Sequence, residues 1–272
     1  MSVHVENGVG ILTDTTKCIG CRECVAACKR RNHLEADVPR RWSLDDGLSA
    51  RNWTSIVEKE LPNGDPAFIR KQCRHCDEPA CASVCPVGAL RKDPETGAVV
   101  YDGDKCMGCR YCMMACPYGV PRYDWDQSVP YVRKCILCND HLKAGEKPAC
   151  TNACPTGATI FGTREELLKV AHKRLEKYPN RYIQHVWGEH EIGGTSVLYI
   201  SDTDLSFLSY GSKLSDETLP ARTKTAMGAV PPVFVGMAGT MTGVYWIIKR
   251  RMKNQQHKDV SANHHPEGKS NG

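Results

Sequence analysis

Residues 18–28 read CIGCRECVAAC, and residues 106–116 read CMGCRYCMMAC. Both stretches space their four cysteines as C-x2-C-x2-C-x3-C. All sixteen cysteines of the 272-residue chain fall into four such groups: Cys18, Cys21, Cys24, Cys28; Cys73, Cys76, Cys81, Cys85; Cys106, Cys109, Cys112, Cys116; and Cys135, Cys138, Cys150, Cys154. The second group widens one interval to C-x4-C, and the fourth opens it to a loop before Cys150. Proline follows three of the groups, as Pro86, Pro117 and Pro155, whereas Lys29 follows Cys28.

This spacing indicates [4Fe–4S] clusters. Three cysteines in one tight loop can reach three irons of a single cubane, whereas the fourth cysteine lies on a following helical turn and faces the other way. In two-cluster ferredoxins that fourth cysteine ligates the partner cluster. A proline after it fixes φ and lets the chain leave the helix.

Zinc and disulfides are the alternatives. Zinc sites of four thiolates usually take two C-x2-C knuckles separated by a longer loop. Cysteines three apart bridge poorly, and small disulfide scaffolds are much shorter than this chain. We therefore expect four [4Fe–4S] clusters, and a zinc-knuckle binding protein remains a remote alternative.

Composition narrows the function further. The formal net charge is +5 with Lys and Arg dispersed along the chain, so nucleic-acid binding has no compositional support. The sequence has no G-x-G-x-x-G fingerprint, no P-loop and no H-E-x-x-H motif. We therefore expect a chain that moves electrons and is not an enzyme on its own.

An internal repeat predicts the fold. Residues 11–22 match residues 99–110, each being a short apolar strand, an Asp-containing turn and a cysteine loop. Residues 83–90 likewise match residues 152–160. The fold class predicted is α+β, with two ferredoxin-like domains, small insertions and one C-terminal transmembrane helix. Because such units have little apolar core, the metal-free chain should fold poorly.

Besides the cysteines, several short sequence segments resemble a known family, and the resemblance covers roughly residues 10–250. They are residues 48–50 with Trp53-Thr54, residues 70–73, residues 145–150 and residues 161–163. With them the chain resembles the iron–sulfur subunits that partner molybdopterin enzymes of the dimethyl-sulfoxide-reductase superfamily, and those of some respiratory nickel–iron hydrogenases.

The resemblance implies how the cysteines are shared. One cluster would take Cys18, Cys21, Cys24 and Cys154; its neighbour Cys135, Cys138, Cys150 and Cys28; the third Cys73, Cys76, Cys81 and Cys116; and the fourth Cys106, Cys109, Cys112 and Cys85. It also implies the domains: 10–28 with 130–201 as the first ferredoxin domain, 29–72 as an insertion, 73–129 as the second ferredoxin domain, 202–225 as a linker, 226–248 as a transmembrane helix and 249–272 as a disordered cytoplasmic tail.

Smaller features outside the cysteines give local predictions. Thr163 and Glu166 form a capping box that opens a helix running to about Lys177, with strands predicted over 158–161 and 195–200. We expect Trp42 and Trp53 to serve packing or an interface rather than electron hopping. For His75 a packing or surface role is expected, with tuning of a cluster potential as the alternative.

Residues 226–248 carry no charged side chain. A helix of this length spans about 34 Å, enough for a hydrocarbon core of about 30 Å. Gly239 and Gly243 form a G-x-x-x-G face suited to a partner helix. Residues 249–253 are more basic than residues 222–225, so the positive-inside rule predicts a cytoplasmic C-terminus and a periplasmic cluster domain on a single-pass inner-membrane chain.

Partners follow from the same resemblance. The N-terminal ten residues have no apolar h-region and no twin-arginine pair, so we expect the chain to be exported with a partner that carries the signal. This favours a formate dehydrogenase-type large subunit with a molybdenum or tungsten pterin, and a membrane cytochrome b that reduces quinone. A quinone-linked nickel–iron hydrogenase is the alternative, which phrases such as residues 188–195 favour.

Overall fold

The computed structural model describes residues 8–34, 46–61, 64–125, 131–208 and 214–262. The chain divides into two compact units, one ending at Arg222 and the other beginning at Thr223. The first unit contains all sixteen cysteines. Its first half is the part that carries the first and fourth cysteine groups, and its second half is the part that carries the second and third groups. Trp42 lies outside the described residues.

A three-stranded sheet forms the centre of the first unit. Strand β1 (Val9–Asp14) pairs antiparallel with β8 (Thr159–Thr163) and parallel with β9 (Val197–Ile200), so the strand order is β8-β1-β9. A short 3-10 turn, η1 (Thr15–Lys17), leads from β1 into the first cysteine loop. Residues far apart in the sequence therefore close the first half of the cluster region.

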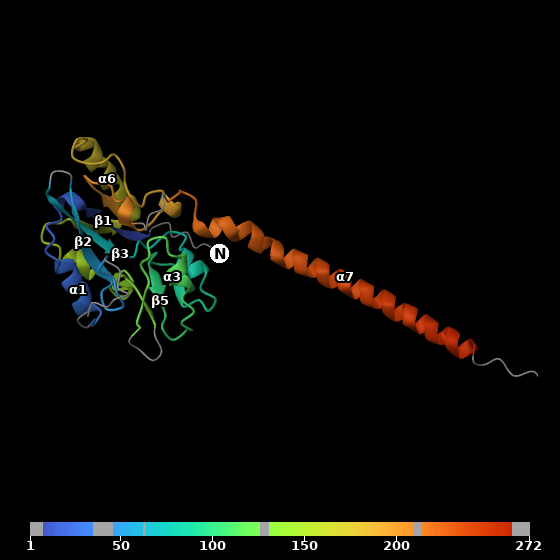
Figure 1. The fold of residues 1–272 in the computed structure, drawn as a ribbon. Coiled ribbons are helices and arrows are strands. Elements are labelled where there is room, and N and C mark those ends of the chain that lie inside the picture. Colours follow the sequence, from blue (N-terminus) through green and yellow to red (C-terminus); the bar gives the residue numbers. More distant parts are fainter. Residues whose placement is uncertain (1–7, 35–45, 62–63, 126–130, 209–213, 263–272) are drawn as a thin grey trace, which may run out of the picture. The chain divides into compact units, whose positions relative to one another are not determined.

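The two faces of this sheet have different neighbours because successive side chains of a strand alternate. Leu12, Leu198 and Ile200 pack against the helix α6 (Arg164–Lys177), which lies along one side of the sheet (Figure 1). Ile11 and Tyr199 face the other way and pack with cysteine-bearing elements. The sheet thus separates an ordinary apolar core from the cluster region.

Helix α6 is the element that the sequence predicts most closely. The Thr163 hydroxyl accepts a hydrogen bond from the Glu166 backbone N–H, and the Glu166 carboxylate accepts one from the Thr163 backbone N–H. This is the predicted capping box, and the helix ends at Lys177 as predicted.

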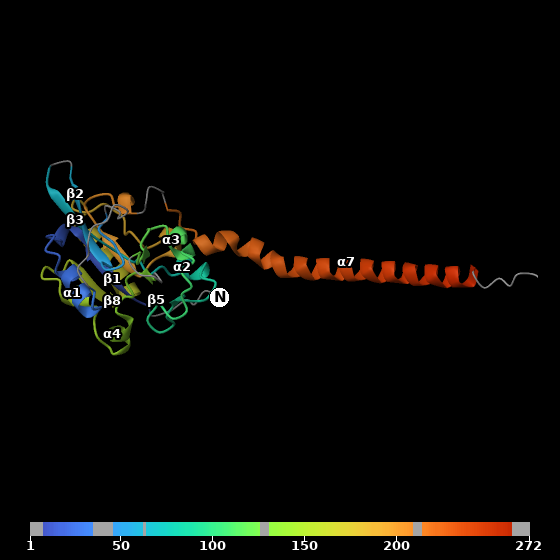
Figure 2. The same ribbon diagram turned by 60° about the horizontal axis from the view of Figure 1, so that its bottom comes forward.

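The insertion is a long antiparallel hairpin. Strands β2 (Thr54–Glu60) and β3 (Pro66–Gln72) run side by side in both views (Figures 1 and 2). The last residues of β3 are buried, and Ile69 joins the same apolar cluster as Ile11. The hairpin therefore packs into the first half rather than standing apart from it.

The remaining elements are short, as expected where loops bind clusters. Helix α1 (Glu23–Arg31) carries Cys24 and Cys28. The other short elements are α2 (Ala80–Ser83), β4 (Leu90–Lys92), β5 (Val99–Tyr101), α3 (Tyr111–Ala115), β6 (Arg122–Tyr123), β7 (Val132–Arg133), α4 (Asn139–Lys143), α5 (Ala149–Asn152), η2 (Glu191–Gly193) and η3 (Ser206–Leu208).

One buried carboxylate ties the two halves together. Asp93, between β4 and β5, accepts hydrogen bonds from the Asn139 amide at 3.1 Å and pairs with Lys143 at 2.9 Å, both on α4. Asp93 is only 5% exposed. The second half is thereby fastened to the first at a defined point.

Helix α7 (Leu219–Ala262) corrects two predicted boundaries. It begins at Leu219 rather than residue 226, because the Thr218 hydroxyl accepts a hydrogen bond from the Ala221 N–H and Pro220 suits a first helical turn. It also continues to Ala262, so the prediction of a disordered tail is wrong for residues 249–262. This stretch holds no Gly or Pro and extends a helix already nucleated.

Helix α7 is long and apolar enough to cross a membrane. In the described structure none of its most apolar stretch is buried by the rest of the chain. The helix includes Pro231 and Pro232.

Candidate cluster sites

Two cavities in the first half are each lined by four cysteines. The first is lined by Cys18, Cys21, Cys24 and Cys154, and the second by Cys28, Cys135, Cys138 and Cys150. Each set combines cysteines from the first and the fourth sequence groups. The structure therefore brings together residues separated by more than a hundred positions.

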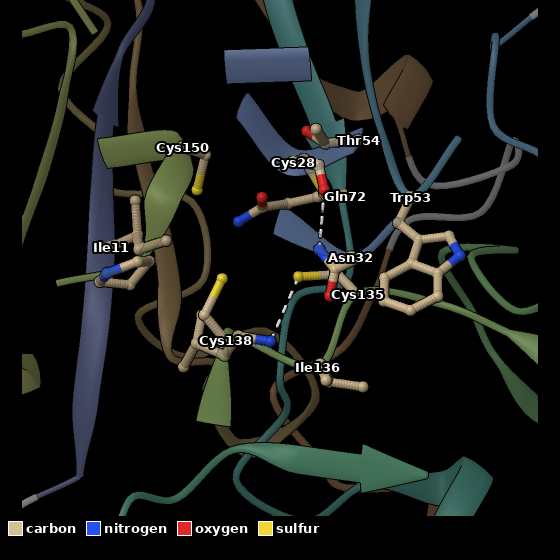
Figure 3. Close-up of a pocket in the computed structure, with 12 residues that line it drawn as sticks. Ile11, Cys28, Asn32, Trp53, Thr54, Gln72, Cys135, Ile136, Cys138 and Cys150 are labelled. Atoms are coloured by element: carbon tan, nitrogen blue, oxygen red, sulfur yellow. Dashed lines mark hydrogen bonds between the residues drawn. The ribbon is translucent and has the colours of Figure 1, made fainter. Parts of the chain in front are cut away.

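The second cavity shows the arrangement directly (Figure 3). The sulfurs of Cys28, Cys135, Cys138 and Cys150 surround a common space of about 350 Å³, partly open to solvent. The first cavity holds about 380 Å³.

Local backbone geometry forms the cysteine loops. Gly20 and Gly108 have φ of 68° and 72°, a left-handed conformation that glycine adopts without steric cost. Arg22 and Arg110 follow at the equivalent positions, also left-handed, and each precedes a helix. The matching loops confirm the repeat seen in the sequence.

Helix α1 connects the two cavities. Cys24 and Cys28 are four residues apart, so they lie on one face of the helix about 6 Å apart along its axis. Cys24 lines the first cavity and Cys28 the second. Two neighbouring sites are therefore joined by one helical turn.

The second half gathers its cysteines in the same interleaved way. Burial raises the pKa of Cys76 well above its ordinary value, and the nearby thiols of Cys116, Cys81 and Cys73 raise it further. Burial likewise raises the pKa of Cys112 to about 11, with added effects of its neighbours Cys106, Cys109 and Cys85. Each set again takes one cysteine from the partner group.

Contacts between the four sets follow a single order. Cys24 of the first set interacts with Cys150 of the second. Cys135 of the second interacts with Cys73, and Cys81 of the third interacts with Cys112. The sets therefore form a row in which the neighbours are first to second, second to third and third to fourth.

Most of these thiols are held protonated when no metal is bound. Burial raises the pKa of Cys24 to about 11 and that of Cys28 to about 12. Cys154 differs: burial opposes its ionisation, but hydrogen bonds led by the Thr159 N–H lower its pKa to about 7. Metal binding must release protons from the thiols whose pKa is raised, which couples the occupancy of their sites to pH.

The donor set fits iron–sulfur cubanes. All sixteen cysteines are free of disulfides. The backbone N–H of Leu137 donates to the Cys135 sulfur at 3.4 Å, and the Asn32 amide donates to the Cys28 sulfur at 3.6 Å. Among the described residues no group of three or more His, Cys, Asp or Glu is arranged to hold one metal ion.

Two side chains at the cavities were not predicted as site residues from the sequence. Arg70 lines the first cavity and Gln72 the second. Both side chains are buried. Their buried nitrogen atoms have no hydrogen-bond partner in the described part of the chain. The sequence signal for them is two polar residues two positions apart, on one face of the strand that ends just before Cys73.

Two other residues singled out by the sequence, Trp53 and His75, lie in the described part of the chain. Trp53 lines the second cavity and donates its indole N–H to the Ala50 carbonyl at 2.9 Å (Figure 3). His75 is fully buried, and its Nδ1 accepts a hydrogen bond from the Val99 N–H at 2.9 Å. The proton of this imidazole is therefore on Nε2.

Comparison with known proteins identifies 4Fe-4S domains in this chain. Two family models, both described as a 4Fe-4S dicluster domain, match residues 17–89 and 65–164. A protein of Nitratidesulfovibrio vulgaris is 41% identical, covering 91% of this chain and 69% of the relative.

Two further relatives have informative names. The hydrogenase-2 operon protein HybA of Escherichia coli O157:H7 is 38% identical, covering 93% of this chain and 88% of its own length. The iron–sulfur subunit of the nitrate-inducible formate dehydrogenase of E. coli K12 is 33% identical, covering 94% and 90%. The chain therefore belongs to the family of non-catalytic iron–sulfur electron-transfer subunits that includes these hydrogenase-operon and formate dehydrogenase proteins.

Proposed function

We propose that this chain holds four [4Fe–4S] clusters in a row and conducts electrons between a catalytic large subunit and a quinone-reactive membrane subunit. The bound clusters would supply one-electron carriers. The four cysteine sets would ligate them as the family resemblance implies, each set taking three cysteines of one group and one of its partner group.

The observation that carries this proposal is the order of the sets. Each set interacts with the next through specific thiols, such as Cys24 with Cys150 and Cys81 with Cys112. The first and second sets share helix α1, which fixes their spacing. Four separate metal sites without electron transfer would need no such row.

The surrounding residues also suit this role. Ile11, Leu137 and Tyr199 are at most 1% exposed and pack in the core that contains Cys24 and Cys150. Apolar walls keep water from the sites and lower the local dielectric, which strengthens each nearby charge.

The membrane side of the proposal rests on α7. Lys249, Arg250, Arg251 and Lys253 follow its apolar stretch, against Arg222 and Lys224 before it. By the positive-inside rule the C-terminus is cytoplasmic, and the cluster-bearing unit faces the periplasm of a single-pass chain. The small Gly239 and Gly243 surface would pack on a helix of the membrane subunit.

Two classes of large subunit are candidates. The 33% identity to a formate dehydrogenase iron–sulfur subunit over 94% of this chain supports a formate dehydrogenase with a molybdenum or tungsten pterin. The higher identity to the hydrogenase-2 operon protein, 38% against 33%, favours a nickel–iron hydrogenase.

Elemental analysis of the complex, purified anaerobically through a tag on this chain, tests both levels of the proposal. Iron with molybdenum or tungsten supports the formate dehydrogenase, and iron with nickel supports the hydrogenase. Zinc with little iron refutes the electron-transfer proposal.

A cysteine variant tests the ligation. In Cys112→Ala, iron should fall from about sixteen atoms per chain to about twelve, or to about fifteen if a three-iron cluster remains. Quinone reduction should be interrupted. Met114→Ala is the matched control, since Met114 lies on the same helix and is 86% exposed. Unchanged iron and full quinone reduction in Cys112→Ala would contradict the ligation.

A further inference from the structure

Arg70 is a deeply buried charged side chain that lines the first cavity. It lies on β3, two residues before the strand ends, and is 1% exposed. Its Nε, Nη1 and Nη2 atoms have no hydrogen-bond partner among the described residues. Arginine is rarely buried without a partner, because its guanidinium carries five N–H donors and a permanent charge.

The guanidinium lies among cysteines of two different sets. Arg70 lines the first cavity with Cys24 and interacts with Cys135 and Cys150 of the second set. Burial opposes its charge, but these thiols and Tyr199 raise the pKa of Arg70 above its ordinary value. Because a guanidinium stays protonated in folded proteins, its charge is retained at the boundary between the two sites.

The position of Arg70 is fixed by its own backbone. The Tyr199 hydroxyl donates to the Arg70 carbonyl at 2.8 Å, and Tyr199 is fully buried in the sheet. The strand β3 is paired along its length with β2. The backbone of Arg70 is thus fixed by these hydrogen bonds, and its guanidinium has no hydrogen-bond partner among the described residues.

Gln72 shows that β3 presents a second donor in the same way. It is two residues further on, hence on the same face of the strand. Its amide nitrogen has no hydrogen-bond partner in the described part of the chain and is directed into the space between the sulfurs of Cys138 and Cys150 (Figure 3). Unused donors therefore face both cavities.

We propose that Arg70 tunes the two clusters of the first ferredoxin domain: its guanidinium donates hydrogen bonds to cluster sulfur and its charge raises both reduction potentials. This inference rests on the proposed function. Each cluster takes one electron and becomes more negative, and no proton moves because Arg70 stays protonated. A nearby cation and N–H···S bonds stabilise the more negative form, which raises the potential.

Redox titration of the intact complex, followed by electron paramagnetic resonance, tests this inference. In Arg70→Gln the reduction equilibrium constants of two of the four clusters should fall at least tenfold, about 59 mV for a one-electron couple. Arg70→Lys keeps the charge but loses the planar fork, so the potentials should fall less. The other two clusters should titrate as in the wild type.

Arg30→Gln is the matched control. Arg30 lies on α1 of the same domain, but its side chain is 69% exposed and pairs with Glu23 at 3.9 Å. Removing this charge should leave all four potentials nearly unchanged because solvent screens it. Potentials unchanged in Arg70→Gln with full iron content, or an equal shift of all four potentials, would overturn the inference.

A measurement on unsubstituted Arg70 keeps the inference testable if both variants lose iron. The complex is labelled with guanidino-¹⁵N arginine in an Arg22→Lys background, since Arg22 also lines the first cavity. Electron–nuclear double resonance of the reduced clusters should detect ¹⁵N coupling, and its absence would refute hydrogen bonding by Arg70. Wild-type complex without iron–sulfur signals would instead refute the proposed function.

Discussion

Asp14 joins the first cysteine loop to the rest of its domain. It is the last residue of β1, and its carboxylate is fully buried. It accepts hydrogen bonds from the Thr16 hydroxyl at 2.7 Å, the Tyr182 hydroxyl at 2.9 Å and the Arg174 guanidinium at 3.0 Å. We predict that Asp14→Ala destabilises the cluster-bearing unit strongly.

The expected size follows from burial. Breaking a buried charge pair costs about 3–5 kcal/mol, and the lower end applies because Arg174 is 22% exposed and regains some hydration. For a unit of this size 1 kcal/mol corresponds to about 2–4 °C, so the unfolding midpoint should fall by about 6–12 °C. Loss of cluster absorbance on heating the anaerobic complex, at neutral pH and one scan rate, measures it.

A double-mutant cycle decides whether the carboxylate and the guanidinium act together. Asp14→Asn with Arg174→Gln should show a coupling of at least about 1 kcal/mol. The exposed pair of Glu23 and Arg30, with side chains 54% and 69% exposed, is the control and should couple by less than about 0.5 kcal/mol. Additive effects of the Asp14 and Arg174 substitutions would refute the reasoning.

Two further predictions concern other parts of the same unit. Burial opposes the ionisation of Asp93, but the Lys143 ammonium and nearby donors lower the pKa of its carboxyl to about 2 from the ordinary 3.8. The ionised carboxylate therefore stabilises the folded unit, on the order of 1–2 kcal/mol because solvent screens the exposed Lys143. This contribution is present above pH 4 and is lost as the pH falls toward 2. Asp93→Asn should therefore lower the unfolding midpoint clearly less at pH 3 than at pH 7, and an equal loss at both pH values would contradict this. A Cβ at Gly10 would lie 2.2 Å from the Ser196 carbonyl oxygen, so Gly10→Ala should reduce the yield of iron-loaded chain severalfold, whereas Gly103→Ala, whose Cβ meets no atom closer than 3.7 Å, should not. Normal iron loading of Gly10→Ala would show that the two strands can separate without cost.

Local chemistry made several features predictable. The capping box at Thr163 and Glu166 depends on residues three apart, so the sequence predicts α6 without knowledge of its surroundings. The cysteine loops of the first and third groups are likewise local, because each carries its own glycine, Gly20 or Gly108, and the same spacing. The interleaved sharing of cysteines came instead from the family resemblance, and the ligation itself stays a prediction.

Features that depend on contacts between distant parts of the chain could not be predicted from the sequence. The parallel register of Ile11 with Val197 joins strands separated by most of the chain, and neither strand specifies its partner. The burial of Arg70 follows from that assembly, because a charged residue in an isolated hairpin would be expected to face water. The helix from residue 249 to Ala262 was missed because polar composition was given more weight than helix propensity.

The sharing of cysteines between distant groups has a consequence for biosynthesis. Cys154 emerges from the ribosome about 130 residues after Cys24, roughly 6–26 s later at about 5–20 residues per second. Strand β9, which completes the central sheet, follows later still. Residues 73–116 contain both sets of the second half, so that half can be completed first. The earliest cysteines to be made are thus among the last to be enclosed, and during this interval they depend on the reducing environment of the compartment in which the chain is synthesised.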